Sequence, residues 1–241
     1  MRFHRLVLLP LLAVLATAAG ISCSGGSDSS PTTTQTPTPA PAGNLFANPG
    51  FEAGDDPWFT LNDESGFELT TELAHEGDFS AVLRMNDPES AEGSKVYYLV
   101  QEASPDEFPE VVEGFYRVEN WNRGAVRQYV QFVVIAFGPS NFPDSATNFQ
   151  LRYLLAGIDT PPFSISNAKF VFVDREEPVE GEWIPINLNI REDFRERWGL
   201  VPEDVELLRL LFEVRYDAKA AGSGAARGDV YYDDLYIGPA R

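Results

Sequence analysis

Polar side chains alternate with apolar ones along several stretches of the sequence, and their chemical types suit the binding of a polar ligand. One side of three such stretches carries amides, guanidinium groups and a carboxylate: Asn148, Gln150, Arg152, Asn187, Arg209, Glu213 and Arg215. Such groups donate and accept hydrogen bonds in fixed directions, and an aromatic ring beside them would add a flat apolar surface. A solvated sheet face often has the same composition. Both interpretations remain open from these residues alone.

The composition excludes several other kinds of site. The chain has 241 residues, of which 37 are acidic and 18 basic, so its formal net charge is −19. Nucleic-acid recognition needs a basic surface, and we therefore expect no nucleic-acid partner. The single cysteine, Cys23, excludes an intramolecular disulfide and a cysteine-rich zinc site. His4 and His75 are the only two histidines of the sequence, so we do not expect a catalytic serine–histidine triad.

The elements that must position the polar side chains are β-strands. Segments rich in β-branched and aromatic residues lie between turn-forming clusters such as 138–141 and 222–224. We predict strands over Phe79–Met85, Val96–Val100, Gly114–Val118, Gln128–Phe137, Phe149–Leu155, Lys169–Val173, Trp183–Ile190, Leu207–Tyr216 and Val230–Ile237. The spacing of Phe194 and Trp198 predicts one short amphipathic helix over Arg191–Trp198. These elements predict an all-β domain built as a two-sheet β-sandwich.

Strict alternation assigns a core-facing side to three of these strands. The inward set is Phe149, Leu151, Tyr153, Leu155, Ile184, Ile186, Leu188, Ile190, Leu208, Leu210, Phe212, Val214 and Tyr216. The polar residues named first then face outward, together with Trp183 and Asn189. One domain over residues 44–241 is long enough to bury such a core.

Residues 1–22 have the pattern of an export signal. Two arginines precede the run 6–19, which is almost wholly apolar, contains Pro10 and is shorter than the ~20 residues that cross a bilayer. The segment Gly20-Ile21-Ser22-Cys23 resembles a bacterial lipoprotein cleavage box, which implies that Cys23 is lipidated. Gly20 stands where that pattern prefers a branched aliphatic residue, and Ala16-Thr17-Ala18 suits ordinary signal peptidase. Secretion without lipid is therefore the alternative.

Residues 23–43 form a predicted tether between the lipidated cysteine and the domain. After Cys23 the segment consists almost entirely of Ser, Thr, Gly, Pro and Ala, which cannot bury enough apolar surface to offset the entropy of ordering. Fully extended, this linker would reach on the order of 66 Å at ~3.3 Å per residue. We therefore expect an exported protein that is anchored at the membrane surface of the cell envelope.

Three segments of the domain resemble carbohydrate-binding modules of the galactose-binding-like group. The first is Asn44-Leu-Phe-Ala-Asn-Pro-Gly-Phe-Glu52 with Trp58 beyond it, and the second is Ala74-His-Glu-Gly-Asp-Phe-Ser-Ala-Val-Leu83. The third is Val230-Tyr-Tyr-Asp-Asp-Leu-Tyr-Ile237, which is similar to the terminal strand of that group. The three occur in the order of the family and span almost the whole domain. The resemblance implies a two-sheet antiparallel jelly-roll β-sandwich, with Trp58 in its core.

The resemblance also implies a structural calcium ion. In such modules the opening glutamate and an aspartate of the terminal strand meet near a glycine-containing turn, and Glu52, Asp233 and Asp78 occupy these positions here. Calcium takes six to eight oxygen ligands and accepts a mixture of carboxylates and carbonyls. We expect Asp233 to share the inward face of Leu235 and Ile237, where an unpaired carboxylate would be costly.

Carbohydrate is the ligand that the resemblance implies, and its recognition needs an aromatic platform beside amides and carboxylates. Trp183, on the polar side of its strand, is the first candidate for the platform, and Trp121 is the second. Trp198 is expected to anchor the helix. The candidate hydrogen-bonding residues are Gln131, Gln150, Arg152, Asn187, Glu213 and Arg215.

The predicted function is therefore a non-catalytic, tethered module that binds an oligosaccharide or polysaccharide. Jelly-roll glycosidases use paired carboxylates, for which one signature is Glu-x-Asp-x-x-Glu on a single strand, and that spacing is absent from the sequence. A structural or adhesion lipoprotein that binds no sugar is the main alternative. A glycan hydrolase is a further one.

Overall fold

The computed structural model describes residues 41–62, 66–142 and 147–241. The predicted signal peptide, Cys23 and all but the end of the predicted linker lie outside these ranges. Within them, no helix has both the length and the apolar character needed to span a membrane.

One layer of the structure is a five-stranded sheet with the order β1-β2-β10-β4-β8. All of its neighbouring strands are antiparallel. Its strands are β1 (Phe67–Thr70), β2 (Ser80–Asp87), β10 (Ala226–Gly238), β4 (Val111–Asn122) and β8 (Trp183–Leu188).

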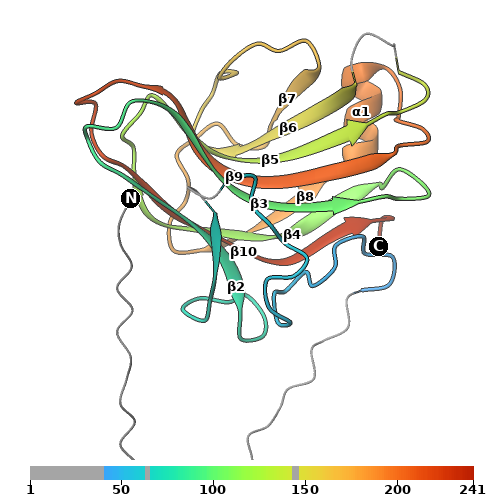
Figure 1. Cartoon of the computed structure of the whole chain (residues 1–241), viewed down its shortest axis with the longest axis horizontal. Coiled ribbons are helices and arrows are strands. Elements are labelled where there is room, and N and C mark those ends of the chain that lie inside the picture. Colours follow the sequence, from blue (N-terminus) through green and yellow to red (C-terminus); the bar gives the residue numbers. More distant parts are fainter. Residues whose placement is uncertain (1–40, 63–65, 143–146) are drawn as a thin grey trace, which may run out of the picture. The chain divides into compact units, whose positions relative to one another are not determined.

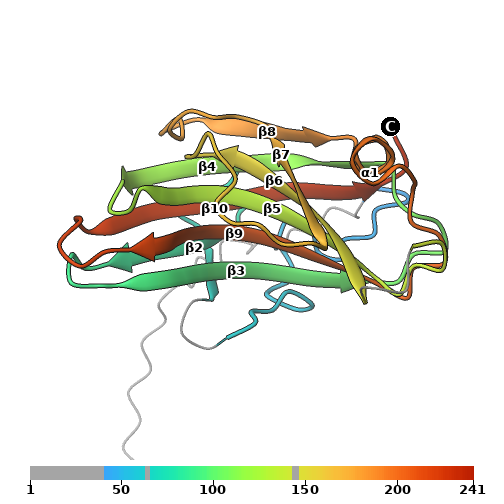
Figure 2. The same ribbon diagram turned by 90° about the horizontal axis from the view of Figure 1, so that it is seen from above.

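The other layer is a five-stranded sheet with the order β3-β9-β5-β6-β7. Its strands are β3 (Gly93–Ala103), β9 (Leu207–Lys219), β5 (Arg127–Phe137), β6 (Asn148–Ala156) and β7 (Ala168–Phe172). The pairs are antiparallel except β6 and β7, which run parallel. Figure 1 shows the two layers stacked on each other, and Figure 2 shows the same layers from above.

The predicted fold class, an all-β two-sheet sandwich with one short helix, is confirmed. All nine predicted strands are present, and most extend a few residues beyond the predicted bounds, into polar ends where the apolar pattern fades. The prediction missed β1, a four-residue edge strand with too few residues to show alternation. Ile190 was predicted to end a strand but is instead the first residue of the helix.

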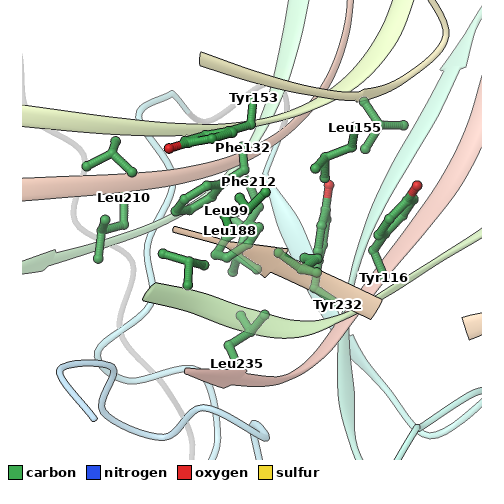
Figure 3. Packing of buried hydrophobic residues seen from close by; sticks show 14 of the residues in the cluster. Leu99, Tyr116, Phe132, Tyr153, Leu155, Leu188, Leu210, Phe212, Tyr232 and Leu235 are labelled. Atoms are coloured by element: carbon green, nitrogen blue, oxygen red, sulfur yellow. The ribbon is translucent and has the colours of Figure 1, made fainter. Parts of the chain in front are cut away.

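The core lies between the sheets and consists of the side chains that alternation assigned to it. All members of the predicted inward set are buried except Ile184, which is half-buried and packs against the core. Phe212 is at the centre, with its ring centroid 4.6 Å from that of Phe132 and 4.9 Å from that of Tyr232. Phe132 and Phe212 come from neighbouring strands of one sheet and Tyr232 from the other sheet, and Figure 3 shows all three in the core. Trp58 also belongs to the core, as expected.

The helix α1 (Ile190–Trp198) closes one end of the sandwich (Figure 2). The Asn189 side chain accepts a hydrogen bond from the backbone N–H of Glu192 at 3.1 Å, which caps the first turn. Gly199, in the left-handed conformation, ends the helix. Phe194 is fully buried against Phe108, and Trp198 packs against Phe149 at 5.1 Å, so the expected anchoring role of Trp198 is confirmed.

A β-bulge on β10 changes the predicted orientation of Asp233. The pairing of β10 with β4 shifts between Asp233 and Tyr236, and Asp234 has a φ of 51°. Tyr232 and Leu235 both belong to the core, so the extra residue breaks the alternation that placed Asp233 with Leu235 and Ile237. Asp233 is fully buried, but beneath the turn at residues 75–76 rather than in the core.

We expect Asn189→Ala to destabilise the domain by about 1 kcal/mol because the first turn of α1 loses its cap. For a domain of this size the melting temperature should fall by roughly 2–4 °C. Asn187→Ala removes the same side chain from an exposed position two residues earlier and is the matched control. Equal losses in the two variants, measured by chemical denaturation, would contradict a capping role for Asn189.

Candidate functional site

Five of the predicted ligand residues come together on the outer face of the β3-β9-β5-β6-β7 sheet. We call them the polar face: Gln131, Gln150, Arg152, Glu213 and Arg215. The strand register brings them together, because Gln131 of β5 lies opposite Glu213 of β9, and the next outward pair is Tyr129 with Arg215. On the other side of β5, Val133 lies opposite Arg152 of β6. Residues from three strands, β5, β6 and β9, that are far apart in the sequence therefore become neighbours.

The polar face points away from the core, as predicted for Gln150, Arg152, Glu213 and Arg215, but much of it is covered. Gln131 is 0% exposed and Glu213 is 2% exposed, which is far less than a solvated sheet face would show. Phe163, in the connection between β6 and β7 (Figure 1), lies over this surface. Its ring centroid is 5.4 Å from the guanidinium carbon of Arg152 and 5.6 Å from that of Arg215. A plain solvated face therefore does not describe these residues.

Arg215 is the centre of a network of ion pairs and hydrogen bonds. Its guanidinium lies 2.5 Å from a carboxylate oxygen of Asp217 and 3.4 Å from one of Glu213. Asp217 also accepts a hydrogen bond of 2.6 Å from the hydroxyl of Tyr129, whose pKa is raised by burial so that the proton is retained. Gln131 donates to Glu213 through its amide nitrogen. Both carboxylates are therefore already engaged.

Arg152 differs from Arg215 because it has no carboxylate partner among the described residues. Its Nε donates to the amide oxygen of Gln150 at 3.0 Å, and this is a neutral acceptor. Burial lowers the pKa of Arg152 from its usual value, the charge of Glu213 opposes that shift, and the charge of Arg215 adds to it. A guanidinium without a charge partner thus lies among buried groups.

Several polar atoms of this face have no hydrogen-bond partner within the part of the chain that the structure describes. Six buried side-chain nitrogen or oxygen atoms lack a partner in the described residues, and three of them are here: Gln131 Oε1, Arg152 Nη1 and Arg215 Nε. A buried polar atom left unsatisfied costs about 1–3 kcal/mol, so most folded proteins contain few. Their concentration on one face indicates a site whose hydrogen bonds are completed by something other than the chain itself.

The aromatic residues beside the polar face were not predicted from the sequence. Tyr98 of β3 lies directly opposite Glu213 and is half-buried, and Tyr129 packs beneath Arg215 at 5.6 Å. Both alternate onto the outer side of their strands, so the period of two could have found them. Phe163 lies in an irregular connection after two prolines, where no periodic pattern exists. The sequence offered no signal for its position.

Trp183 and Asn187, two further predicted ligand residues, lie on the other sheet. Asn187 lines a pocket of about 750 Å³ that is also formed by Phe115, His75 and Glu52. His75 stacks on Phe115 with ring centroids 3.6 Å apart, and its Nδ1 lies 2.5 Å from a carboxylate oxygen of Asp234. The ring of Trp183 meets His75 edge-on at 5.6 Å. These residues are separated from the polar face by the whole sandwich.

Trp121, the second aromatic candidate, is at a third location near the end of β4. Its indole nitrogen donates to the carboxylate of Glu177 at 2.8 Å, and its backbone N–H donates to Glu180 at 2.9 Å. The ring also covers Gly228, where a Cβ would be 2.7 Å from Cε3 of the indole. Trp121 therefore packs against β10 and does not join the polar face.

The predicted calcium residues meet around one turn of the chain. Glu52 Oε1 accepts hydrogen bonds from the backbone N–H groups of Asp78 and Phe79, both at 2.9 Å. Asp233 Oδ2 accepts from the N–H groups of His75 and Glu76 at 2.7 and 3.2 Å. Burial, with the nearby charge of Asp234, raises the pKa of Asp233 to about 7.

These residues fit a calcium ion only in part. In the described ranges, no group of three or more histidine, cysteine or acidic side chains is placed to hold a metal ion. Glu52 and Asp233 hold the turn through hydrogen bonds to its backbone, so a cation would need carbonyl oxygens to complete its shell. The calcium ion and the role of Asp78 remain predictions.

Comparison with known proteins gives structural similarities only. No protein-family model matches the chain, and no match was found among curated proteins. A solved structure of TmCBM61 in complex with β-1,4-galactotriose is 14% identical, with a TM-score of 0.44, and the match covers 80% of this chain and 97% of that one. A family 16 carbohydrate-binding module is 14% identical, with a TM-score of 0.43 and coverage of 80% and 99%.

Enzyme domains are also among the similar structures. The enzymatically active domain of a tailspike protein from bacteriophage CBA120 is 13% identical, with a TM-score of 0.39, and the match covers 81% of this chain and 21% of that one. The structural neighbours thus include carbohydrate-binding modules of β-sandwich fold as well as enzymes. All three identities are below 25% and all three TM-scores are below 0.5, so we take no ligand and no family from them.

Proposed function

We propose that this protein is a non-catalytic module that binds an oligosaccharide or polysaccharide on the polar face. The observation that carries the proposal is the set of three buried polar atoms that have no partner among the described residues, Gln131 Oε1, Arg152 Nη1 and Arg215 Nε, beside aromatic rings. Sugars present hydroxyl groups that both donate and accept hydrogen bonds, and their ring faces pack on aromatic side chains. The polar face supplies partners for both kinds of contact.

Phe163 lies over Arg152 and Arg215, so a ligand that binds at this face must either displace its ring or pack against it. The connection that carries it, residues 157–167, has no regular secondary structure, and Phe163 itself is only partly buried. Its ring packs edge-on against Phe170 at 5.3 Å. A partly buried aromatic side chain in an irregular connection, lying over two guanidinium groups, is well placed to pack on a bound sugar.

The arrangement favours binding over hydrolysis. A glycosidase of the common type needs one carboxyl that gives a proton and a second carboxylate that acts as nucleophile or base across the scissile bond. Two carboxylates, Glu213 of the polar face and Asp217 beside it, are both ion-paired with Arg215. They therefore serve to hold Arg215 in place, and we assign no catalytic residue.

A polysaccharide panel tests this function and its location. In affinity gels, at least one polymer should retard the protein without release of reducing ends. Tyr98→Ala, which removes the half-buried ring opposite Glu213, should weaken binding about tenfold, a loss of ~1.4 kcal/mol. Trp183→Ala truncates a partly buried ring on the other sheet and should leave binding unchanged, with melting curves verifying that both variants fold.

The outcomes separate the alternatives clearly. Loss of binding in Trp183→Ala but not in Tyr98→Ala would place the ligand in the pocket near His75 and contradict the polar face. Release of sugar would indicate a hydrolase. Failure of every polymer to bind would leave the structural or adhesion role.

A structural calcium ion is a further part of the proposal. Glu52 and Asp233 would supply carboxylate oxygens, and the ion would neutralise acidic groups that meet at the turn of residues 75–79. We expect calcium to raise the melting temperature and a chelator to lower it. Glu52→Gln should abolish the difference, whereas Glu196→Gln, an exposed position on α1, should preserve it. An unchanged melting temperature with chelator would remove calcium from the proposal.

The last part of the proposal is a lipid anchor at Cys23, supported by the sequence of residues 1–43. Expressed from its full sequence in bacteria, the protein should sediment with membranes and incorporate labelled fatty acid. Cys23→Ser should release it into the soluble fraction without label. Wild-type protein that is soluble and unlabelled would support secretion instead.

A further inference from the structure

We propose that the carbohydrate bound at the polar face is acidic and that Arg152 binds its carboxylate. The ligand class is therefore a glycan that contains uronic acid residues. This inference rests on the proposed function, because it assigns a chemical class to the ligand of the same site.

The charges of the polar face lead to this assignment. Arg215 has two carboxylate partners, Glu213 and Asp217, and these two acids have Arg215 as their ion-pair partner in return. Arg152 lies on the same face and has only the neutral amide of Gln150. Among the described residues, Arg152 is thus the guanidinium of this face that lacks an anion. A carboxylate is the anion that a planar guanidinium binds best, through two parallel hydrogen bonds.

The atoms without partners specify what else the ligand should contain. Arg152 Nη1 and Arg215 Nε are donors that need acceptors, and Gln131 Oε1 is an acceptor that needs a donor. A carboxylate offers acceptors only, whereas the hydroxyl groups of the same sugar can donate as well. One uronic acid residue therefore carries both kinds of group. A simple anion such as acetate would leave Gln131 without a donor.

The cost of burying Arg152 also favours a functional role. A buried charge without a counter-charge destabilises the folded protein, and the buried charges of proteins are therefore usually paired with an opposite charge. Here Arg152 is half-buried beneath Phe163, its Nη1 is shielded from solvent, and it has no carboxylate partner among the described residues, although the chain has about twice as many acidic as basic residues. With a net charge of −19 the protein as a whole repels an acidic polymer. Binding such a ligand would therefore require a local, unpaired cation of this kind.

Matched pairs of polymers test the inference. Polygalacturonate, alginate and glucuronoxylan are each compared with the same polymer after chemical reduction of its carboxyl groups to primary alcohols. Reduction leaves linkage and ring stereochemistry in place and replaces each carboxylate with a neutral hydroxymethyl group. We expect isothermal titration to show at least tenfold tighter binding of one native polymer than of its reduced form.

Variants of Arg152 identify the residue responsible. Arg152→Gln should abolish the preference for the native polymer, whereas Arg152→Lys should retain part of it because the charge remains. Arg209→Gln is the matched control: Arg209 lies on the same strand as Arg215 and is paired with Glu102 at 2.6 Å. Because Arg152 lacks a charge partner, Arg152→Gln should melt at the same temperature as the wild type or higher. A purely structural Arg152 would instead lower the melting temperature and leave the preference intact.

The failure of this inference can be distinguished from failure of the proposed function. Equal binding of native and reduced polymers, or binding of neutral polymers alone, would overturn the acidic ligand and leave carbohydrate binding in place. Absence of binding to every native, reduced and neutral polymer would overturn both. A preference for native polymer that survives in Arg152→Gln would overturn the role of Arg152.

Discussion

The pairing of β5 with β9 in one fixed register is the constraint on which both the core and the polar face depend. Successive side chains of a strand point to opposite faces, so this register aligns Phe132 with Phe212 inside and Gln131 with Glu213 outside. A slip by one residue would exchange the two faces and expose the aromatic centre of the core. The apolar packing that stabilises the sandwich therefore also determines which polar groups meet on its outer surface.

The polar face carries a larger cost than the core. Among the described residues, the core leaves the buried hydroxyl of Tyr232 without a hydrogen-bond partner, whereas the polar face half-buries Arg152 without a carboxylate partner and leaves three polar atoms without partners. Such groups reduce stability, and a fold tolerates them when the rest of the domain supplies a surplus. Here the surplus comes from two large sheets, and from contacts that join the ends of the domain. Leu45 donates its backbone N–H to Ile237 at 2.8 Å, and the side chain of Asn44 bonds to the backbone of Leu235 and Ile237.

The predicted aromatic platform illustrates the limit of reasoning from one strand at a time. Trp183 and Arg152 both lie on the outward side of their strands, and alternation treats them alike. Strand order then places β8 at the edge of one sheet and β6 within the other, so the two side chains are on opposite surfaces of the sandwich. The rings that do lie beside Arg152 and Arg215 are Phe163 and Tyr129.

The sequence by itself determined the all-β class, nine of the strands, the helix, the inward residues and the outward orientation of the polar set. These follow from local periodicity, because burial of every second side chain leaves a pattern of period two in the chain. Only the tertiary structure decided which outward residues meet, since strand order and register depend on contacts between distant segments. It also decided that Phe163 covers the polar face and that a bulge turns Asp233 away from the core. An irregular connection and a single extra residue leave no periodic trace, so no local pattern could have revealed them.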